Sequence, residues 1–136
     1  MIKSITIDNL QTYSDAYKAE IFLHEKKVLL IFEPDGSAIE ETLKFANKLI
    51  PNLEEFDDKA KKYLSKECLG IYNTEIRKKD EAKIDKNTFE IQLVLDEISF
   101  VGDDFVLFFY KGIAEDFTWV ASSSDGENFD EYDILT

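Results

Sequence analysis

The chain has 136 residues, of which 44% are hydrophobic and 33% charged, and its formal net charge is −13 at pH 7. A chain of this length fits one domain with one core, and its hydrophobic content is that of a folded protein. The negative charge repels phosphate backbones and anionic lipid, so we expect neither nucleic acid nor a membrane as a direct ligand. A basic protein or a cation is compatible with it.

The beginning of the chain, MIKSITIDNL, has neither the apolar run nor the cleavage site of a secretory signal. No stretch reaches the roughly 18 apolar residues of a membrane span. The single cysteine, Cys68, excludes an internal disulfide and a zinc site built from cysteines, which agrees with a reducing compartment. We therefore expect a soluble cytoplasmic protein without a cofactor.

The first segments of the chain have strand patterns. ITI and KAEIFLHEKKVLLIFE are predicted strands, with a turn at Glu25-Lys26-Lys27. The run from Val28 to Phe32 is apolar throughout, which is typical of a strand buried on both faces.

Two helices are predicted next. Ser37 and Glu40 form a capping-box pattern after a Pro-Asp-Gly turn, and Pro51 ends the helix that they begin. Asn52 with Glu55 predicts the cap of a second helix, whose apolar residues continue at helical spacing. The polar segment RKKDEAKIDKN that follows is expected to be an exposed connection or a helix tail.

The period then changes from helix to strand. Apolar residues alternate from Phe89 through Ile91 to Leu95, and the alternation slips at Asp96-Glu97, where we expect a β-bulge. The segment FVLFFY is apolar at every position, which predicts a central strand covered on both sides.

The C-terminal segment is predicted to be a hairpin. With Asp125-Gly126 at the centre of a type I′ turn, Trp119 lies opposite Tyr132, and Phe117 opposite Ile134, on one face. In this register Glu131 and Asp133 lie on the opposite face of the hairpin from Trp119.

A cation site is the alternative interpretation of this segment. In an EF-hand register, Ala121 and Tyr132 would stand where the first and last carboxylate ligands are needed, so that motif is absent. A non-standard site formed by Asp125, Glu127 and Asp130 stays open, although clustered acids are usually a solvated face.

The residues that enzymes commonly use are few. Cys68 lies on the apolar stripe of the second predicted helix, which favours a buried thiol, and His24 is expected at the surface. Ser122, Ser123 and Ser124 lack a G-x-S-x-G elbow and are interpreted as turn residues, and a phosphate-binding glycine loop is absent. An enzyme, or a small-molecule or cation-binding domain that uses carboxylates, remains the alternative class.

The segments VLLIFEPD, ETLKFANKLIPNLEEFDDKAKKYL, GIYN, TFEIQLVLDEISF and DFTWVASSSDG, in this order, resemble a bacterial family known as domain of unknown function 2262. The resemblance covers most of the chain and implies one α+β domain of bacterial type without an assigned activity. In that family Gly-His often follows the phenylalanine that matches Phe117, whereas Thr118 and Trp119 follow it here.

The predicted fold is α+β, a mixed and largely antiparallel sheet of about six strands with two consecutive helices packed on one face. Residues 96–136 hold eleven acids and one base, a net charge of −10, against −3 for residues 1–95. We therefore predict a protein-binding module whose acidic C-terminal hairpin engages a basic partner, for instance as an immunity-type inhibitor of a toxin. The residues expected at this interface are Glu127, Phe129, Asp130, Glu131 and Asp133.

Overall fold

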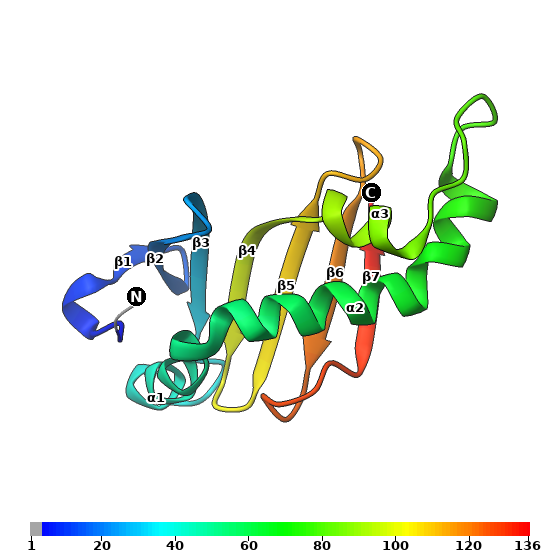
Figure 1. The fold of residues 1–136 in the computed structure, drawn as a ribbon. Helices are drawn as coiled ribbons and strands as arrows, with labels where there is room; N and C mark the ends of the chain where they lie inside the picture. The colour runs from blue at the N-terminus through cyan, green and yellow to red at the C-terminus, as the bar shows by residue number, and fades with distance from the viewer. Residues whose placement is uncertain (1–3) are drawn as a thin grey trace.

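One seven-stranded sheet forms the centre of the molecule, and all the helices labelled in Figure 1 lie on one side of it. The structure is a computed structural model that describes residues 4–136. The strands neighbour one another in chain order, and every pair is antiparallel except β3 with β4. The strands are β1 (Gln11–Tyr13), β2 (Ala16–Leu23), β3 (Lys26–Glu33), β4 (Val94–Val101), β5 (Phe105–Lys111), β6 (Thr118–Ser123) and β7 (Glu131–Leu135).

The parallel pair exists because the chain crosses from β3 to β4 through the helical layer. This crossover contains α1 (Ile39–Leu49), α2 (Leu53–Ile71) and α3 (Lys86–Gln92). Helix α1 packs on β3 and β4, and α2 runs across the sheet as far as β6 (Figure 1). The predicted α+β class and the mixed, mostly antiparallel sheet are confirmed, with seven strands in place of about six and a third, short helix.

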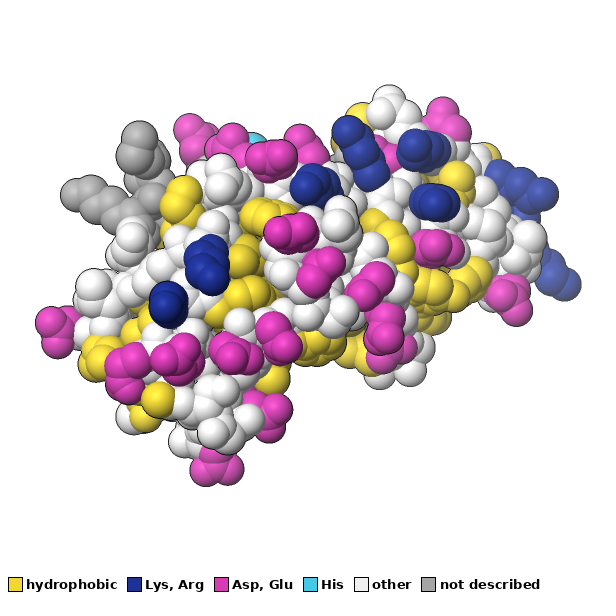
Figure 2. Space-filling view, turned by 90° about the horizontal axis from the view of Figure 1, so that it is seen from below, with side chains coloured by type: hydrophobic (Ala, Val, Ile, Leu, Met, Phe, Trp, Pro, Cys, Tyr) yellow, Lys and Arg dark blue, Asp and Glu magenta, His cyan; other side chains and the backbone are white. Residues whose placement is uncertain are grey.

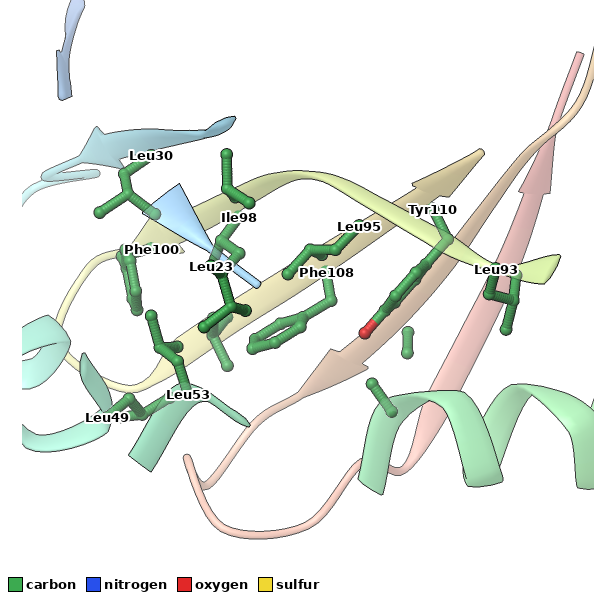
Figure 3. Packing of buried hydrophobic residues seen from close by; sticks show 14 of the residues in the cluster. Leu23, Leu30, Leu49, Leu53, Leu93, Leu95, Ile98, Phe100, Phe108 and Tyr110 are labelled. Atoms are coloured by element: carbon green, nitrogen blue, oxygen red, sulfur yellow. The ribbon is translucent and has the colours of Figure 1, made fainter. Parts of the chain in front are cut away.

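The core lies between the sheet and the helices (Figure 3). Alternate residues of each strand point toward the helices, and α2 presents apolar residues at helical spacing to them. The largest side chains of this core that are less than 2% exposed are Trp119, Tyr110, Phe32, Phe89, Phe100 and Phe108. Within residues 4–136, no helix has both the length and the apolar character needed to cross a membrane.

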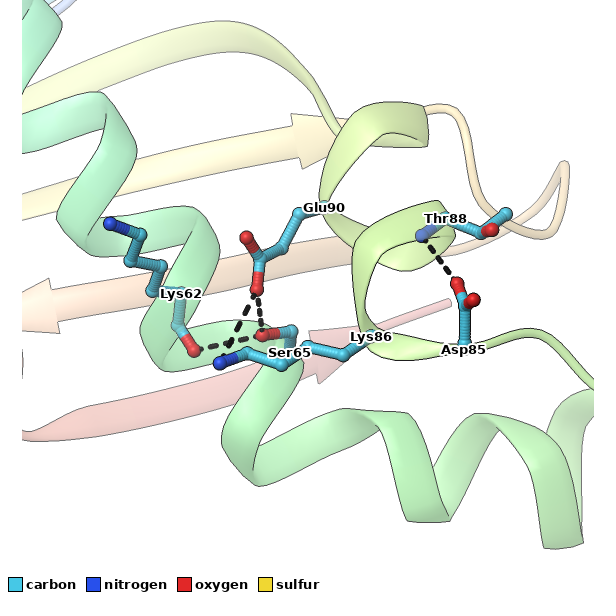
Figure 4. Close-up of polar contacts among 6 residues, drawn as sticks. All are labelled: Lys62, Ser65, Asp85, Lys86, Thr88 and Glu90. Carbon is cyan, nitrogen blue, oxygen red and sulfur yellow. Dashed lines mark hydrogen bonds and ion pairs between the residues drawn. The ribbon is translucent and has the colours of Figure 1, made fainter.

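Helix α3 corrects the strand predicted from Phe89 onward. The Asp85 side chain accepts a 2.8 Å hydrogen bond from the backbone N–H of Thr88 and caps the helix (Figure 4). Phe89 is fully buried with its ring 5.4 Å from that of Trp119, whereas Ile91 is 72% exposed. The alternating pattern was misleading because a short apolar run fits a helix as well as a strand.

A buried polar contact joins α3 to α2. The Ser65 hydroxyl donates a 2.6 Å hydrogen bond to the Glu90 carboxylate, and the carbonyl of Lys62 lies 3.0 Å from the same hydroxyl oxygen (Figure 4). Lys86, one turn before Glu90, lies 4.0 Å from the same carboxylate oxygen. Ser65 therefore keeps its buried hydroxyl paired, and α3 is held in place by polar as well as apolar contacts.

The first predicted strand, ITI, is wrong. The Ile5 backbone is bonded to the Asn47 side chain of α1, which accepts from the Ile5 N–H at 2.8 Å and donates to its carbonyl at 2.9 Å. A 3₁₀ turn over Ile7–Asn9 follows, and the first strand begins only at Gln11. Because Asn47 uses both hydrogen-bonding groups of Ile5, that residue has none left for a sheet.

Other boundaries differ by a few residues. Ala38, and not Ser37, is the N-cap of α1, and it makes no side-chain cap bond. The β2–β3 turn consists of His24 and Glu25, both with positive φ, so the predicted turn lysines belong to β3. The break between the two long helices lies at Pro51 as predicted, in a 3₁₀ turn. The predicted bulge is confirmed by a register shift between Leu95 and Glu97.

Candidate functional site

The side of the sheet that faces away from the helices is called the open face here, because no described helix covers it (Figure 1). Its side chains alternate with those of the core along each strand. On β5, Phe105, Leu107 and Phe109 are half-buried, so the expectation that this strand is covered on both sides is wrong. The neighbouring apolar members of this face are Leu29 on β3 and Val101 on β4, which are half-buried, and Ile31 on β3 and Val120 on β6, which are buried.

Glu97 lies in the middle of this apolar surface. The register places it between Leu29 of β3 and Phe109 of β5. Its carboxylate accepts one long hydrogen bond of 3.4 Å, from the Ser99 hydroxyl. Partial burial raises the pKa of Glu97, opposed by the Ser99 bond and reinforced by the negative charge of Asp96 and of a more distant glutamate. The bulge decides this position, because it restores Glu97 to the open face after Leu95 has turned into the core.

Two of the five predicted interface residues lie at the edge of the open face. Glu131 pairs with Ser122 and Asp133 pairs with Val120, both across the β6–β7 ladder. Both carboxylates are exposed, and β7 is the last strand of the sheet. The open face therefore has a partly exposed apolar centre, with one carboxylate inside it and two along its β7 edge.

The hairpin register differs from the prediction by two residues. Trp119 pairs with Ile134, and Ala121 pairs with Tyr132. The cause is the connection, which spans residues 124–130 and is longer than a two-residue turn. A shift by two leaves each side chain on the predicted face, so Trp119 is buried under the helices while Glu131 and Asp133 lie on the other side.

The Asp125 side chain is exposed but is hydrogen-bonded to other residues of this connection. Its carboxylate accepts hydrogen bonds from the Ser123 hydroxyl at 2.9 Å and from the N–H groups of Glu127 and Asn128 at 2.8 and 2.9 Å. These bonds lower the pKa of Asp125. Gly126 is buried and has positive φ, and a Cβ there would lie 2.8 Å from the Phe45 ring. This part of the chain is a packed structural loop.

The other three predicted interface residues, Glu127, Phe129 and Asp130, do not lie on the open face. The Phe129 ring packs edge-on against that of Phe108, with 5.2 Å between ring centroids, and so contributes to the core side. Glu127 is exposed at the loop, and the Asp130 carboxylate accepts a 2.9 Å bond from the Ser124 hydroxyl. Figure 2 views the molecule from the side of this loop and shows Asp and Glu side chains across it, with most of the Lys and Arg side chains toward the upper right of the view.

The cation alternative gains no support from these positions. Within residues 4–136, no three His, Cys, Asp or Glu side chains are grouped so that they could hold a metal ion. The Asp125 carboxylate is already bonded to backbone N–H groups, and Asp130 to a serine.

Three of the four candidate nucleophiles, Cys68, Ser122 and Ser123, are buried, and Ser124 is exposed in the β6–β7 connection. Burial, and to a smaller extent Glu67, raises the pKa of the Cys68 thiol to about 12, so the thiol stays protonated and inert at neutral pH. Ser122 and Ser123 belong to β6 and are buried, which corrects their interpretation as turn residues. His24 is exposed in the β2–β3 turn, as expected.

One polar cluster was not singled out from the sequence. Asp57 on α2 is 2% exposed, accepts a 2.6 Å hydrogen bond from the Tyr110 hydroxyl of β5 and forms a 3.3 Å ion pair with Lys61. Burial, followed by the charge of Asp57, raises the pKa of Tyr110 well above its usual value. A hollow of about 160 Å³ lies beside the cluster. The signal was present, because Asp57 interrupts the apolar stripe formed by Leu53 and Ala60.

Comparison with family models, with curated proteins and with solved structures found no match to this chain. The resemblance to domain of unknown function 2262 therefore stays a prediction. The candidate site is therefore chosen from the structure alone, and it is the open face with its acidic β7 edge.

Proposed function

We propose that this protein is a cytoplasmic protein-binding module that holds a basic protein partner on the open face and on the acidic hairpin formed by β6 and β7. The observation that carries the proposal is the combination on one surface of half-buried apolar side chains with the carboxylates Glu97, Glu131 and Asp133. An inhibitor of a basic toxin, of the immunity type, is one form that such a module takes.

The apolar part of the surface supports binding. Leu107 and Phe109 are only half-buried, and Phe22 on the same face is 66% exposed. Contiguous apolar surface rimmed by polar groups is characteristic of protein interaction sites, and aromatic anchors contribute much of their binding energy.

The charged part of the surface selects the partner. The chain carries −13 in total and −10 within residues 96–136, and the two β7 carboxylates lie in that region. Such a field accelerates encounter with a basic protein and disfavours acidic ones. Neither the thiol of Cys68 nor the paired carboxylate of Asp57 offers a comparably free reactive group.

Charge reversal tests this proposal. Immobilised protein is exposed to cell lysate at low salt, bound basic proteins are eluted with salt and identified, and the purified pair is reassembled. Glu131→Lys with Asp133→Lys is expected to weaken that pair at least about tenfold, equivalent to about 1.4 kcal/mol. The affinity is measured by titration calorimetry.

The matched control is Asp80→Lys with Glu81→Lys. These acids are exposed in the connection before α3, and the double variant has the same net charge of −9, from −13 plus 4. It is expected to bind within about twofold of wild type, because charges beyond a Debye length are screened. Equal affinities for wild type and the hairpin variant, at unchanged thermal stability, would refute the proposal.

A further inference from the structure

Glu97 has no opposite charge beside it within the described residues. None of the three ion pairs found there involves it, since these join Lys27 to Glu20, Lys61 to Asp57 and Lys86 to Glu90. The lysines that share its face on the adjacent strands have other partners: Lys27 lies 3.1 Å from Glu20, and the Lys111 ammonium donates to Thr118. The Ser99 hydroxyl, at 3.4 Å, is a weak compensation.

This arrangement is unfavourable for the isolated protein. Glu97 lies between Leu29 and Phe109, and its partial burial removes water from the carboxylate without replacing the lost hydrogen bonds. The charges that shift its pKa, Asp96 on its own strand and Glu33 on β3, are both negative and disfavour its ionised form further. A neutral side chain at this position would suit the sheet better.

The same arrangement is favourable for a complex. An interfacial ion pair usually gains little, because both charges lose water when the partners meet. Glu97 has already lost part of its hydration in the free protein, so its share of that cost falls on folding and not on binding. A cation brought to it gains an interaction that the free protein lacks.

We infer that Glu97 is the anchor for an arginine side chain of the basic partner, with the guanidinium paired to the carboxylate and stacked on the Phe109 ring. This inference rests on the proposed function and specifies the partner's chemistry. Arginine fits better than lysine because its planar fork pairs bidentately with a carboxylate while its face stacks on an aromatic ring. Leu29 and Leu107 would contact apolar side chains around it.

The first test needs no partner. Glu97→Gln is expected to raise the midpoint of thermal unfolding at pH 7 by about 3 °C, because it removes the uncompensated charge. Glu131→Gln, on the same face but exposed, is expected to leave the midpoint unchanged.

The pH dependence has a definite sign. Because folding raises the pKa of Glu97, its ionisation destabilises the fold, and this loss appears as the pH rises through the raised pKa. The difference between Glu97→Gln and wild type should therefore be largest at neutral pH and vanish as the pH falls below the usual glutamate value. An unchanged or lower midpoint for Glu97→Gln at pH 7 overturns the inference.

The second test measures coupling to arginine with a defined probe. The probe is an amphipathic helical peptide that presents leucines on one face, one arginine at their centre and lysines beside them. The matched peptide carries citrulline, which is neutral and has the same shape, at the central position. Wild-type protein is expected to bind the arginine peptide about tenfold more tightly than the citrulline peptide, and Glu97→Gln to bind both alike.

Lack of discrimination by wild-type protein, whether both peptides bind equally or neither binds, overturns the inference, as does discrimination retained by Glu97→Gln. Failure of the inference and failure of the proposed function give different results. If the hairpin reversal weakens the captured complex while Glu97→Gln changes neither the unfolding midpoint nor the discrimination, the binding module stands and the arginine anchor falls.

Discussion

Asp57 and Glu97 are carboxylates that are buried or half-buried, which is unusual for their residue types. Asp57 is buried but bonded to Tyr110 and Lys61, so its charge is compensated within the fold. Glu97 is half-buried, and no described residue forms an ion pair with it. The contrast separates a structural carboxylate from a candidate binding one, because a buried charge without a partner costs stability unless a ligand supplies the partner.

Gly112, just after β5, has φ of +104°, and a Cβ there would lie 2.2 Å from the backbone oxygen of Gln92. Gly36 has φ of +90° but nothing within 4 Å of its Cβ position. Gly112→Ala is therefore expected to lose at least about 2 kcal/mol more unfolding free energy than Gly36→Ala. Urea denaturation measures both values, and equal losses would show that the backbone at Gly112 relaxes without cost.

At the scale of elements, α2 is the long helix of the helical layer and crosses the strands of the sheet. Its apolar stripe packs on the strands, and the Tyr110 hydroxyl of β5 reaches across the core to Asp57 of α2 at 2.6 Å. Figure 3 shows the Tyr110 side chain pointing from the sheet into this space. The bond fixes the position of α2 along the sheet more closely than apolar contacts do, because a hydrogen bond has a defined direction.

Removal of this bond should loosen the helix–sheet contact. Tyr110→Phe is expected to lower the free energy of unfolding by about 1–3 kcal/mol, because one oxygen of the buried Asp57 carboxylate loses its donor. Tyr132→Phe is the control, since that side chain is 42% exposed and should change the stability by less than about 0.5 kcal/mol. Chemical denaturation of both variants gives the comparison. A neutral effect of Tyr110→Phe would mean that water or Lys61 replaces the hydroxyl.

At the scale of the whole molecule, the single helical layer leaves one side of the sheet uncovered, and acidic side chains lie along the β7 edge of that side. The helices cover one side of the sheet, and the acidic β7 edge borders the other (Figure 1). Exposed acids on an edge strand also oppose pairing with a second copy of the chain, which keeps an open sheet from aggregating.

Self-repulsion at −13 predicts that salt stabilises the protein. The thermal midpoint is expected to rise between low salt and ~0.5 M sodium chloride, because the added ions screen the acids from one another. The variant Glu131→Lys with Asp133→Lys should show a smaller rise in calorimetry than wild type. A midpoint that falls with salt would mean that attractive pairs outweigh the repulsion.

Much of the fold could be predicted from local pattern. The two long helices, the break at Pro51, the strand FVLFFY and the bulge beside Asp96 all follow from spacing and turn chemistry, which act over a few residues. Of the candidate site, the sequence indicated the acidic C-terminal region and the common face of Glu131 and Asp133. A register error of two residues preserved that face because side chains alternate with a period of two.

The sequence by itself determined the fold class, the main helices and the surplus of negative charge, since these depend on composition and on neighbours along the chain. Only the tertiary structure decided that Phe89 lies on a helix and packs against Trp119, and that Phe129 packs against Phe108 of the core. It also decided that one face of β5 is open and that none of residues 4–136 forms an ion pair with Glu97 in it. These outcomes depend on which distant segments pack together, and an alternating or fully apolar run has the same appearance whether its second side is covered or free.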